Sequence, residues 1–455
     1  MNYSDFIESK RHTSNSFGFE PTWYPDIAFD FQREAIKRAV LKGRVGVFGD
    51  TGLGKTLIQL SIAKNIVLET NKRVLILTPL AVAFQFIDEA EKIGVSDIEH
   101  VKNGNHSKKI VIINYERLHL LDPSDFICVI LDESSILKNF NGQIKNSITA
   151  FIKKVPYRFL STATPSPNDF IELGTSSEAL GYMGYMDMLT KFFKNNQNSA
   201  DSTQNIGEKY YLKPHAERDF FAWVNSWALM FKKPSDLGDF DDTRYQLPNL
   251  NKTVHTVENQ SMIDINGQVQ IFTPIAKSMS EVRLEQKQTV NGRCELAAEL
   301  AQGKTSVYWC NLNEESALLS DLDSSAIEIK GAMSIEQKED ILVNFARGEI
   351  PRIITKAKMT GMGLNWQHCN HTTFFPTFSY EQYYQAIRRF WRFGQKSDVQ
   401  LDLIISDGQS RVIQAIDEKT KKAQELYLNL VANVNAQYIE ANREFKQSAN
   451  LPRFL

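Results

Sequence analysis

The sequence predicts an α/β fold with two lobes, each built on a parallel β-sheet flanked by helices. Two separate stretches of the chain alternate short apolar runs with helical segments, which is the pattern of a parallel sheet. In the first stretch, a glycine-rich turn joins the first apolar run to the helix that follows it. At 455 residues, the chain is also too long for one ordinary core and suits two or three domains.

The first lobe is expected to span residues 1–166. Its apolar runs indicate buried strands at residues 45–48, 74–77, 110–113, 127–131 and 158–160. Helical segments lie between several of these runs, for example at residues 57–69 and 82–93. We therefore expect parallel strands that are connected by helices.

The second lobe is expected to span residues 246–408. Its strands are predicted at residues 306–310, 327–329, 352–354, 372–375 and 399–405, and its helices include residues 335–346 and 381–393. The remaining residues, 409–455, contain a long helical pattern. We expect them to form a C-terminal helical brace.

The segment between the lobes, residues 167–245, is expected to be a mainly helical insertion. A polar tract at residues 194–205 is typical of a surface loop, and residues 247–250 indicate an extended linker. Four apolar residues recur at helical spacing: Phe220, Val224, Trp227 and Phe231. Basic neighbours would allow a nucleic-acid stacking platform there. The favoured interpretation is an amphipathic helix that packs on the first lobe.

Composition excludes some classes of protein and leaves others open. The net charge of -2, from 52 basic and 54 acidic residues, does not exclude nucleic-acid binding, because a cleft can be basic on an acidic protein. No apolar run reaches the length of about 18 residues that a membrane span needs, and residues 1–20 lack the apolar core of a secretory signal. The four cysteines are far apart, without a CxxC pair. We therefore expect no disulfide or zinc site, and a reducing cytoplasm as the location.

The strongest chemical signal is a phosphate loop at residues 49–56, which fits the pattern GxxxxGK[ST] between a predicted strand and a predicted helix. Its glycines let backbone N–H groups face phosphates, and the helix N-terminus adds a positive partial charge. Lys55 is expected to pair with the β- and γ-phosphates of ATP, and the Thr56 hydroxyl to bind Mg²⁺. The expected ATP-binding residues of the loop are Gly49, Asp50, Thr51, Gly52, Leu53, Gly54, Lys55 and Thr56.

A second chemical signal follows the predicted strand at residues 127–131, which ends in the pair Asp132-Glu133. An acidic pair after a strand is common and mostly structural on its own. Downstream of a phosphate loop, it predicts that Asp132 binds the magnesium ion and that Glu133 orients the attacking water.

These residues resemble those of superfamily-two helicases, and most closely the Swi/Snf-like branch of ATP-driven DNA translocases in a compact phage or bacterial form. The likeness extends over most of both lobes. Phe31 and Gln32, one helix before the phosphate loop, resemble the adenine-reading glutamine motif of the family. A glutamine amide can hold both N6 and N7 of adenine.

Other segments of the first lobe resemble motifs that couple the ATP site to nucleic acid. The matching residues are Thr78 and Pro79 of motif Ia, Tyr115 of motif Ic, Ser135 of the DEAH box, and Thr162 and Thr164 of motif III. Ser135 stands where DEAH proteins carry histidine, and a serine can form a hydrogen bond but cannot carry charge. Ala163 likewise replaces the glycine that is usual in motif III of the translocase branch.

In the second lobe, residues 360–365 resemble motif V, and residues 385–395 resemble the QxxxRxxRxGQ pattern of motif VI. The resemblance implies that Gly363 and Gln385 contact ATP. It places Thr360 and Asn365 among the nucleic-acid and coupling residues. It also implies that Arg389 and Arg392 are catalytic, with Arg392 as an arginine finger. By spacing alone, the two arginines could instead solvate an exposed helix face.

The resemblance implies two RecA-like lobes with ATP and Mg²⁺ in the cleft between them. The expected activity is a nucleic-acid-dependent ATPase that translocates on double-stranded DNA with little sequence specificity. The alternatives are a strand-separating DNA or RNA helicase, the motor subunit of a restriction, defence, replication or recombination complex, and a scaffold with a degenerate ATPase site. We expect a monomer, with any targeting or nuclease activity supplied by a partner protein.

Overall fold

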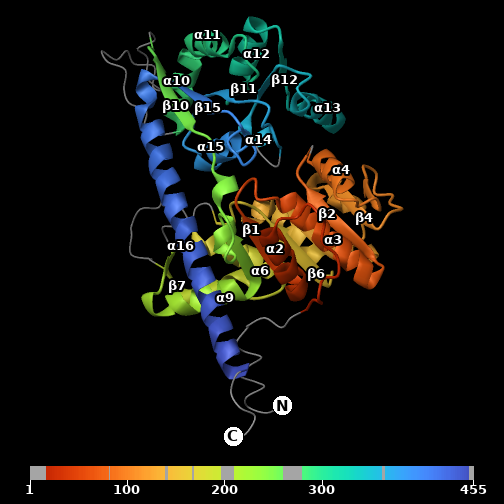
Figure 1. Cartoon of the computed structure of the whole chain (residues 1–455). Helices are drawn as coiled ribbons and strands as arrows, with labels where there is room; N and C mark the ends of the chain where they lie inside the picture. The colour runs from red at the N-terminus through yellow and green to blue at the C-terminus, as the bar shows by residue number, and fades with distance from the viewer. Residues whose placement is uncertain are drawn as a thin grey trace. The chain divides into compact units, whose positions relative to one another are not determined.

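The computed structural model describes residues 17–80, 82–138, 142–166, 169–195, 210–259, 279–360 and 364–449. The chain divides into two compact units. Unit 1 consists of Met1–Pro79, Ala83–Tyr245 and Ala423–Leu455, and unit 2 of Leu80–Val82 and Gln246–Lys422. Each unit contains a parallel β-sheet flanked by helices, which confirms the predicted fold class (Figure 1).

The sheet of unit 1 has seven strands among the described residues, in the order β3-β4-β2-β5-β6-β1-β9, and all of its neighbouring strands are parallel. Five of the strands, β1, β2, β4, β5 and β6, confirm the sequence prediction, with ends that differ by at most one residue. The strands are β1 (Arg44–Gly49), β2 (Arg73–Thr78), β3 (Ile98–His100), β4 (Ile110–Asn114), β5 (Phe126–Asp132), β6 (Tyr157–Ser161) and β9 (Ala228–Phe231).

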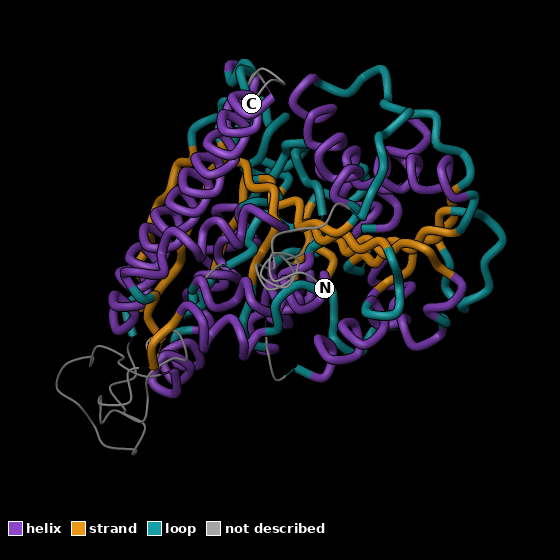
Figure 2. Tube along the Cα trace, turned by 90° about the horizontal axis from the view of Figure 1, so that it is seen from below, coloured by secondary structure: helices purple, strands orange, loops and turns teal. Residues whose placement is uncertain are grey.

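The central strands of this sheet are buried on both faces, which explains their continuous apolar sequences. Every residue of β4 is buried, and so are the last five residues of β2. Figure 2 shows helices on both sides of the strands.

The helices of unit 1 are α2 (Asp30–Lys42), α3 (Lys55–Thr70), α4 (Ala83–Lys92), α5 (Gln143–Ile152), α6 (Leu173–Leu180), α7 (Tyr185–Phe192) and α9 (Glu217–Trp227). Its 3-10 helices are η1 (Tyr115–Leu120), η2 (Pro123–Asp125), η3 (Ser134–Lys138), η4 (Phe170–Glu172), η5 (Pro214–Ala216), η6 (Pro234–Asp236) and η7 (Thr243–Tyr245).

The aromatic segment before residue 231 packs in the core of unit 1. Phe220, Val224 and Trp227 are fully buried on α9, which confirms the favoured interpretation of a packed amphipathic helix. Phe231 does not continue the helix, because the chain turns extended and forms β9, a strand that the sequence did not predict. The run Ala-Leu-Met-Phe is entirely apolar, so helical and strand periods fit it equally well.

Strand β9 lies at an edge of the sheet beside the phosphate-loop strand β1, with Gly49 paired to Phe231. A short antiparallel pair, β7 (Phe193–Asn195) and β8 (Tyr210–Leu212), also belongs to this unit. Most of the polar tract predicted as a surface loop lies outside the described residues.

The sheet of unit 2 has six strands among the described residues, in the order β10-β15-β14-β11-β13-β12, and its strands are parallel throughout. Its strands are β10 (Leu250–Val257), β11 (Ser306–Trp309), β12 (Ala326–Glu328), β13 (Arg352–Thr355), β14 (His371–Phe374) and β15 (Val399–Ser406). Its helices are α10 (Met279–Gln288), α11 (Val290–Ala301), α12 (Asn313–Leu322), α13 (Ile335–Ala346), α14 (Ala357–Thr360) and α15 (Tyr380–Ile387), with the 3-10 helix η8 (Asp407–Gln409).

The expected linker at residues 247–250 contains no helix or strand up to residue 249, and its last residue, Leu250, begins the partly exposed edge strand β10. One prediction for unit 2 needs correction. The helix predicted for residues 381–393 ends at Ile387, and the residues that follow it form turns. Phe390, which follows this turn, is fully buried against Trp309 and Trp366. Tertiary packing of this ring therefore overrides the helical period.

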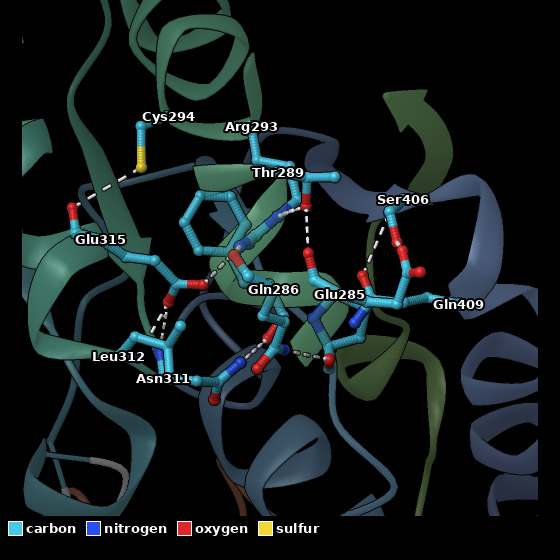
Figure 3. A network of polar contacts seen from close by, with 12 residues as sticks. Glu285, Gln286, Thr289, Arg293, Cys294, Asn311, Leu312, Glu315, Ser406 and Gln409 are labelled. Atoms are coloured by element: carbon cyan, nitrogen blue, oxygen red, sulfur yellow. Dashed lines mark hydrogen bonds and ion pairs between the residues drawn. The ribbon is translucent and has the colours of Figure 1, made fainter. Parts of the chain in front are cut away.

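A buried ion pair joins two helices of unit 2 (Figure 3). Arg293 of α11 and Glu315 of α12 are both fully buried, with 2.8 Å between their charged groups. Glu315 also accepts hydrogen bonds from the backbone N–H groups of Asn311 and Leu312 at 2.8 and 2.9 Å, so it caps the start of its own helix. Removing one partner of such a pair typically costs about 3–5 kcal/mol, because a buried charge is left behind.

The C-terminal helix α16 (Ser410–Ala449) confirms the predicted long helix. It begins in unit 2, and the residues from Ala423 onward belong to unit 1. In unit 1, Leu430, Val431 and Val434 are buried in the main core cluster. Within the described residues, none of the helices combines the length and the apolar character that crossing a membrane requires.

Candidate nucleotide site

The phosphate loop connects the end of β1 to the start of α3, as the sequence predicts. Gly52 and Gly54 have φ angles of +86° and +79°, in the left-handed region that favours glycine. At Gly54, a Cβ atom would lie 2.2 Å from the amide nitrogen of Gln32. Glycine is therefore required there both for its backbone angle and for the close approach of a neighbouring side chain.

Lys55, the first residue of α3, points back over this loop. Its Nζ donates hydrogen bonds to the carbonyl oxygens of Gly49 and Asp50, at 2.9 and 3.0 Å. The Asp50 carboxylate accepts a hydrogen bond from the backbone N–H of Thr51 at 2.6 Å. The structure thus brings the ammonium group to the glycine-rich turn where the sequence expects phosphate.

Gln32 links helix α2 to the phosphate loop. Its side-chain Oε1 accepts a hydrogen bond from the Phe29 N–H at 3.0 Å, and its Nε2 donates to the Leu53 carbonyl at 3.1 Å. Phe31 is buried, and its ring meets the ring of Tyr245 edge-on at 5.3 Å. The glutamine motif therefore holds the loop in place, and Phe31 lies in the core beneath it.

Asp132 is the last residue of β5 and is 8% exposed. Gln59 of α3 donates a hydrogen bond from Nε2 to Oδ1 of Asp132 at 2.8 Å. Tyr115, the first residue of η1, donates its hydroxyl proton to the Asp132 carbonyl at 2.5 Å. Burial, together with the nearby charges of Asp132 and Glu133, raises the pKa of Tyr115 well above its usual value, so the hydroxyl stays a donor. The structure thus ties the side chain of Tyr115 to the backbone of Asp132.

Glu133 is held by two hydroxyl groups. Its Oε1 accepts hydrogen bonds from Thr162 Oγ1 at 2.7 Å and from Ser135 Oγ at 3.2 Å. Its backbone has a φ angle of +52°, which is rare for a residue other than glycine. Thr164 adds a backbone N–H bond to Thr162 Oγ1 at 3.1 Å. The segments that resemble the DEAH box and motif III therefore meet at one carboxylate.

In unit 2, the two arginines of the motif VI segment share a backbone partner. Arg389 donates to the carbonyl of Gln385 at 3.0 Å and to the carbonyl of Leu364 at 3.1 Å. Arg392 donates to the Leu364 carbonyl at 3.4 Å. Arg389 is 5% exposed and follows the end of α15, so it does not solvate an exposed helix face.

The comparisons with protein families match the two units separately. The family described as DEAD/DEAH box helicase matches residues 29–172, and the helicase conserved C-terminal domain matches residues 262–394. The two domains indicate a superfamily-two helicase. Such domains imply that the protein uses ATP and binds nucleic acid. Among the curated proteins compared, none matches the chain.

The residues of this helicase fit a magnesium ion on unit 1. Thr56 lies in the first turn of α3, one turn before Gln59 on the same face of the helix. Because Gln59 bonds to Asp132, the first turn of α3 lies beside the end of β5. Carboxylate and hydroxyl oxygens are ligands that Mg²⁺ prefers. Thr56 and Asp132 are thus suited to hold the ion, and their role as its ligands stays a prediction.

Other expected coupling residues of the helicase are buried. Thr78, at the end of β2, is fully buried, and its hydroxyl has no hydrogen-bond partner among the residues that the structure describes. Pro79 follows it and is buried too. Neither side chain presents a surface in this conformation.

The motif V segment of the helicase is described in part. Gly363 lies outside the described residues, as does the side chain of Thr360, whose backbone closes α14. Asn365 donates a hydrogen bond to Gln367 at 3.5 Å. Gln385 donates from Nε2 to Glu381 at 3.3 Å, one turn earlier on α15.

Sequence reasoning missed two residues that contact the candidate nucleotide site. Gln59 reaches Asp132, and Tyr427 of α16 donates its hydroxyl proton to the carbonyls of Phe48 and Phe231, at 3.0 and 3.3 Å. Phe48 is the next-to-last residue of β1 and Phe231 is the last residue of β9, so both carbonyls lie close to the start of the phosphate loop. A glutamine between the apolar residues Ile58 and Leu60 was a signal for Gln59. No local signal marked Tyr427.

Proposed function

We propose that this helicase hydrolyses ATP at the phosphate loop of unit 1 and uses the energy to translocate on double-stranded DNA. One observation carries the hydrolytic part: the loop helix α3 and the acidic pair at the end of β5 are joined by the bond from Gln59 to Asp132. That contact brings the residues expected to bind phosphate and metal to one edge of the sheet. The DNA part is supported by the resemblance of residues 385–395 to motif VI of the Swi/Snf-like branch.

In the proposed reaction, the Lys55 ammonium binds the β- and γ-phosphates. Its hydrogen bonds to the carbonyls of Gly49 and Asp50 are then replaced by hydrogen bonds to phosphate oxygens. Thr56 and Asp132 would hold the magnesium ion, which would neutralise charge on the phosphates when bound. Glu133 orients the attacking water. Its carboxylate is already fixed by Thr162 and Ser135, so little orientation has to be gained during the reaction.

Arg392 is the proposed arginine finger, and Arg389 supports it. Arg389 is buried and ties Gln385 to Leu364, so its guanidinium has a fixed position. Arg392 is only partly buried, which suits a side chain that must reach a phosphate. A finger of this kind contributes about 10³–10⁵ in rate. That corresponds to roughly 4–7 kcal/mol of barrier.

The experiment for the motor function measures ATP hydrolysis with and without nucleic acid. We expect duplex DNA of any sequence to stimulate the rate. Displacement of a triplex-forming strand, without unwinding of a forked duplex, would support translocation on double-stranded DNA. Fork unwinding would instead support a strand-separating helicase, and no stimulation by any nucleic acid would leave an ATPase without a motor.

The proposed setting is a monomeric motor core in the cytoplasm of a bacterial or phage-infected cell. The four cysteines are unpaired and buried, which suits a reducing compartment. Targeting or nuclease activity would come from a partner protein. Size-exclusion chromatography with light scattering tests the monomer, and a stable dimer at micromolar concentration would contradict it.

A further inference from the structure

Gln59 is a buried polar residue on helix α3 that joins three elements of unit 1. Its side chain is 1% exposed. The amide nitrogen Nε2 donates to Oδ1 of Asp132 at 2.8 Å and lies 3.2 Å from the hydroxyl oxygen of Ser161. Asp132 ends β5, Ser161 ends β6, and the two residues are paired in the sheet. One amide group thus meets the ends of two neighbouring strands.

The direction of the Gln59 amide follows from chemistry. If the amide were turned over, its carbonyl oxygen would face the Asp132 carboxylate, and two acceptors would repel each other. The NH₂ group therefore faces Asp132. The other end of the amide, Oε1, is buried and has no hydrogen-bond partner among the described residues. Burying such an acceptor without a partner lowers stability.

A purely structural role does not explain a glutamine at this position. The neighbouring residues Leu57, Ile58 and Leu60 are buried and apolar. A methionine would fill similar space without burying a polar atom. The glutamine side chain therefore lowers the stability of the fold relative to an apolar residue. What it adds is the hydrogen bond to Asp132.

Ser161 and its neighbour Thr162 each support a different residue of the acidic pair. Ser161 lies beside the amide that bonds to Asp132, whereas Thr162 donates directly to Glu133. The end of β6 therefore supports both carboxylates at the end of β5, one through Gln59 and one directly. This arrangement restricts the orientation of the Asp132 carboxylate.

We propose that Gln59 is a positioning residue that holds the Asp132 carboxylate in the orientation that binds Mg²⁺. The inference rests on the proposed magnesium site at Thr56 and Asp132. A hydrogen bond to Oδ1 is directional and restricts rotation of the carboxylate group. A ligand that is already oriented loses less freedom when it binds the ion.

The test compares Gln59→Met with a control on the same helix, Asn65→Leu. Asn65 is also 1% exposed, but its side chain bonds to the backbone of Thr22 and Trp23, away from Asp132. Binding of a fluorescent ADP analogue is titrated with Mg²⁺, without nucleic acid. Thermal unfolding is followed in the absence of nucleotide.

For Gln59→Met, we expect the half-saturating Mg²⁺ concentration to rise about tenfold, because a hydrogen bond to a charged group is lost. Its unfolding temperature should stay close to that of the parent. For Asn65→Leu, the unfolding temperature should fall and the Mg²⁺ dependence should stay unchanged. Parent-like Mg²⁺ dependence in Gln59→Met would overturn the proposal.

Ser161→Ala gives a second, smaller change should Gln59→Met fail to fold. It removes the second contact of the amide nitrogen, and we expect a rise of about twofold to threefold in half-saturating Mg²⁺. An unchanged value would count against the positioning role. If the parent protein itself bound the nucleotide without any Mg²⁺ dependence, the proposed magnesium site would be wrong, and this result is separate from the behaviour of Gln59.

Discussion

Thr162 Oγ1 donates a hydrogen bond to Glu133 Oε1 at 2.7 Å, and so connects the ends of two adjacent strands, β6 and β5. Glu133 is also one of two residues other than glycine with a positive φ angle among the described residues. Backbone strain of this kind costs about 1–3 kcal/mol and is typical of functional sites. The bond from Thr162 fixes the carboxylate of this strained residue.

The first prediction concerns this bond. Thr162→Val keeps the side-chain shape but removes the donor to Glu133. We expect turnover of ATP to fall roughly 10- to 100-fold, since a hydrogen bond to a charged group contributes about 1.5–3 kcal/mol. Affinity for a fluorescent ADP analogue should stay unchanged. Steady-state kinetics and a binding titration measure the two effects.

The matched control for this prediction is Thr149→Val on α5. Thr149 is 4% exposed, and its hydroxyl has no hydrogen-bond partner in the described part of the chain. This variant should hydrolyse ATP at the parent rate. Equal rates for Thr162→Val and Thr149→Val would show that the contact with Glu133 does not serve the reaction.

The second prediction concerns Lys55. Lys55→Ala removes the cation that contacts the Gly49 and Asp50 carbonyls and that we expect to bind phosphate. ATP hydrolysis should fall to background, and nucleotide binding should weaken by at least about tenfold. Isothermal titration with ATP and Mg²⁺ measures the loss. Binding at the parent affinity would contradict the placement of ATP at this loop.

The third prediction separates the two arginines of unit 2. Arg392→Ala should keep ATP binding and the unfolding temperature but lose about 10³-fold in DNA-stimulated turnover. Arg389→Ala should lower both turnover and the unfolding temperature, because it breaks buried contacts to Gln385 and Leu364. Kinetics and thermal unfolding are measured on both variants. An Arg392→Ala protein that turned over at the parent rate with DNA would show that the finger lies elsewhere.

The fourth prediction concerns the C-terminal helix. Tyr427→Phe removes the hydroxyl that bonds to the Phe48 and Phe231 carbonyls. We expect a loss of about 1 kcal/mol in unfolding free energy. Nucleotide affinity should weaken too, because Phe48 precedes the phosphate loop. Tyr211→Phe, at a residue that is 45% exposed, is the control and should change neither quantity. If the two variants had equal unfolding free energies and equal nucleotide affinities, the hydroxyl of Tyr427 would support neither the fold nor the phosphate loop.

The fifth prediction is a pH dependence in unit 2. Burial alone would raise the pKa of Asp402, but hydrogen bonds from His371, His255 and Gln400 outweigh it and lower the pKa from 3.8 to about 2. A lowered pKa in the folded state stabilises the protein above the unfolded-state pKa. That stability should be lost as the pH falls from about 4 to about 2.

Urea unfolding between pH 5 and pH 2, followed by tryptophan fluorescence, measures this effect against Asp402→Asn. The variant should be less stable than the parent at pH 5, and the difference should shrink as the pH falls, because the amide cannot be protonated in this range. A difference that is constant with pH would contradict the role of Asp402.

The sequence by itself determined the strands and the chemical residues that depend on local pattern. The apolar runs that became β1, β2, β4, β5 and β6 are short, buried on both faces and bounded by turns, so period and length were sufficient. The phosphate loop needs glycines at fixed offsets before a helix, and this requirement is visible in the sequence. The acidic pair Asp132-Glu133 was equally visible because it ends a strand.

The tertiary structure alone decided which residues support the site. Gln59 is 73 positions from its partner Asp132, and Tyr427 is 379 positions from Phe48. No local period encodes such pairs, because they arise only when strands and helices pack. The same reason applies to β9, because its apolar run fits a helix as well as a strand and only its pairing with β1 decides between them. It also applies to the end of α15, where the burial of Phe390 ends the helix earlier than the sequence pattern predicts. Local pattern thus predicted the reacting groups, and long-range packing determined how they are held.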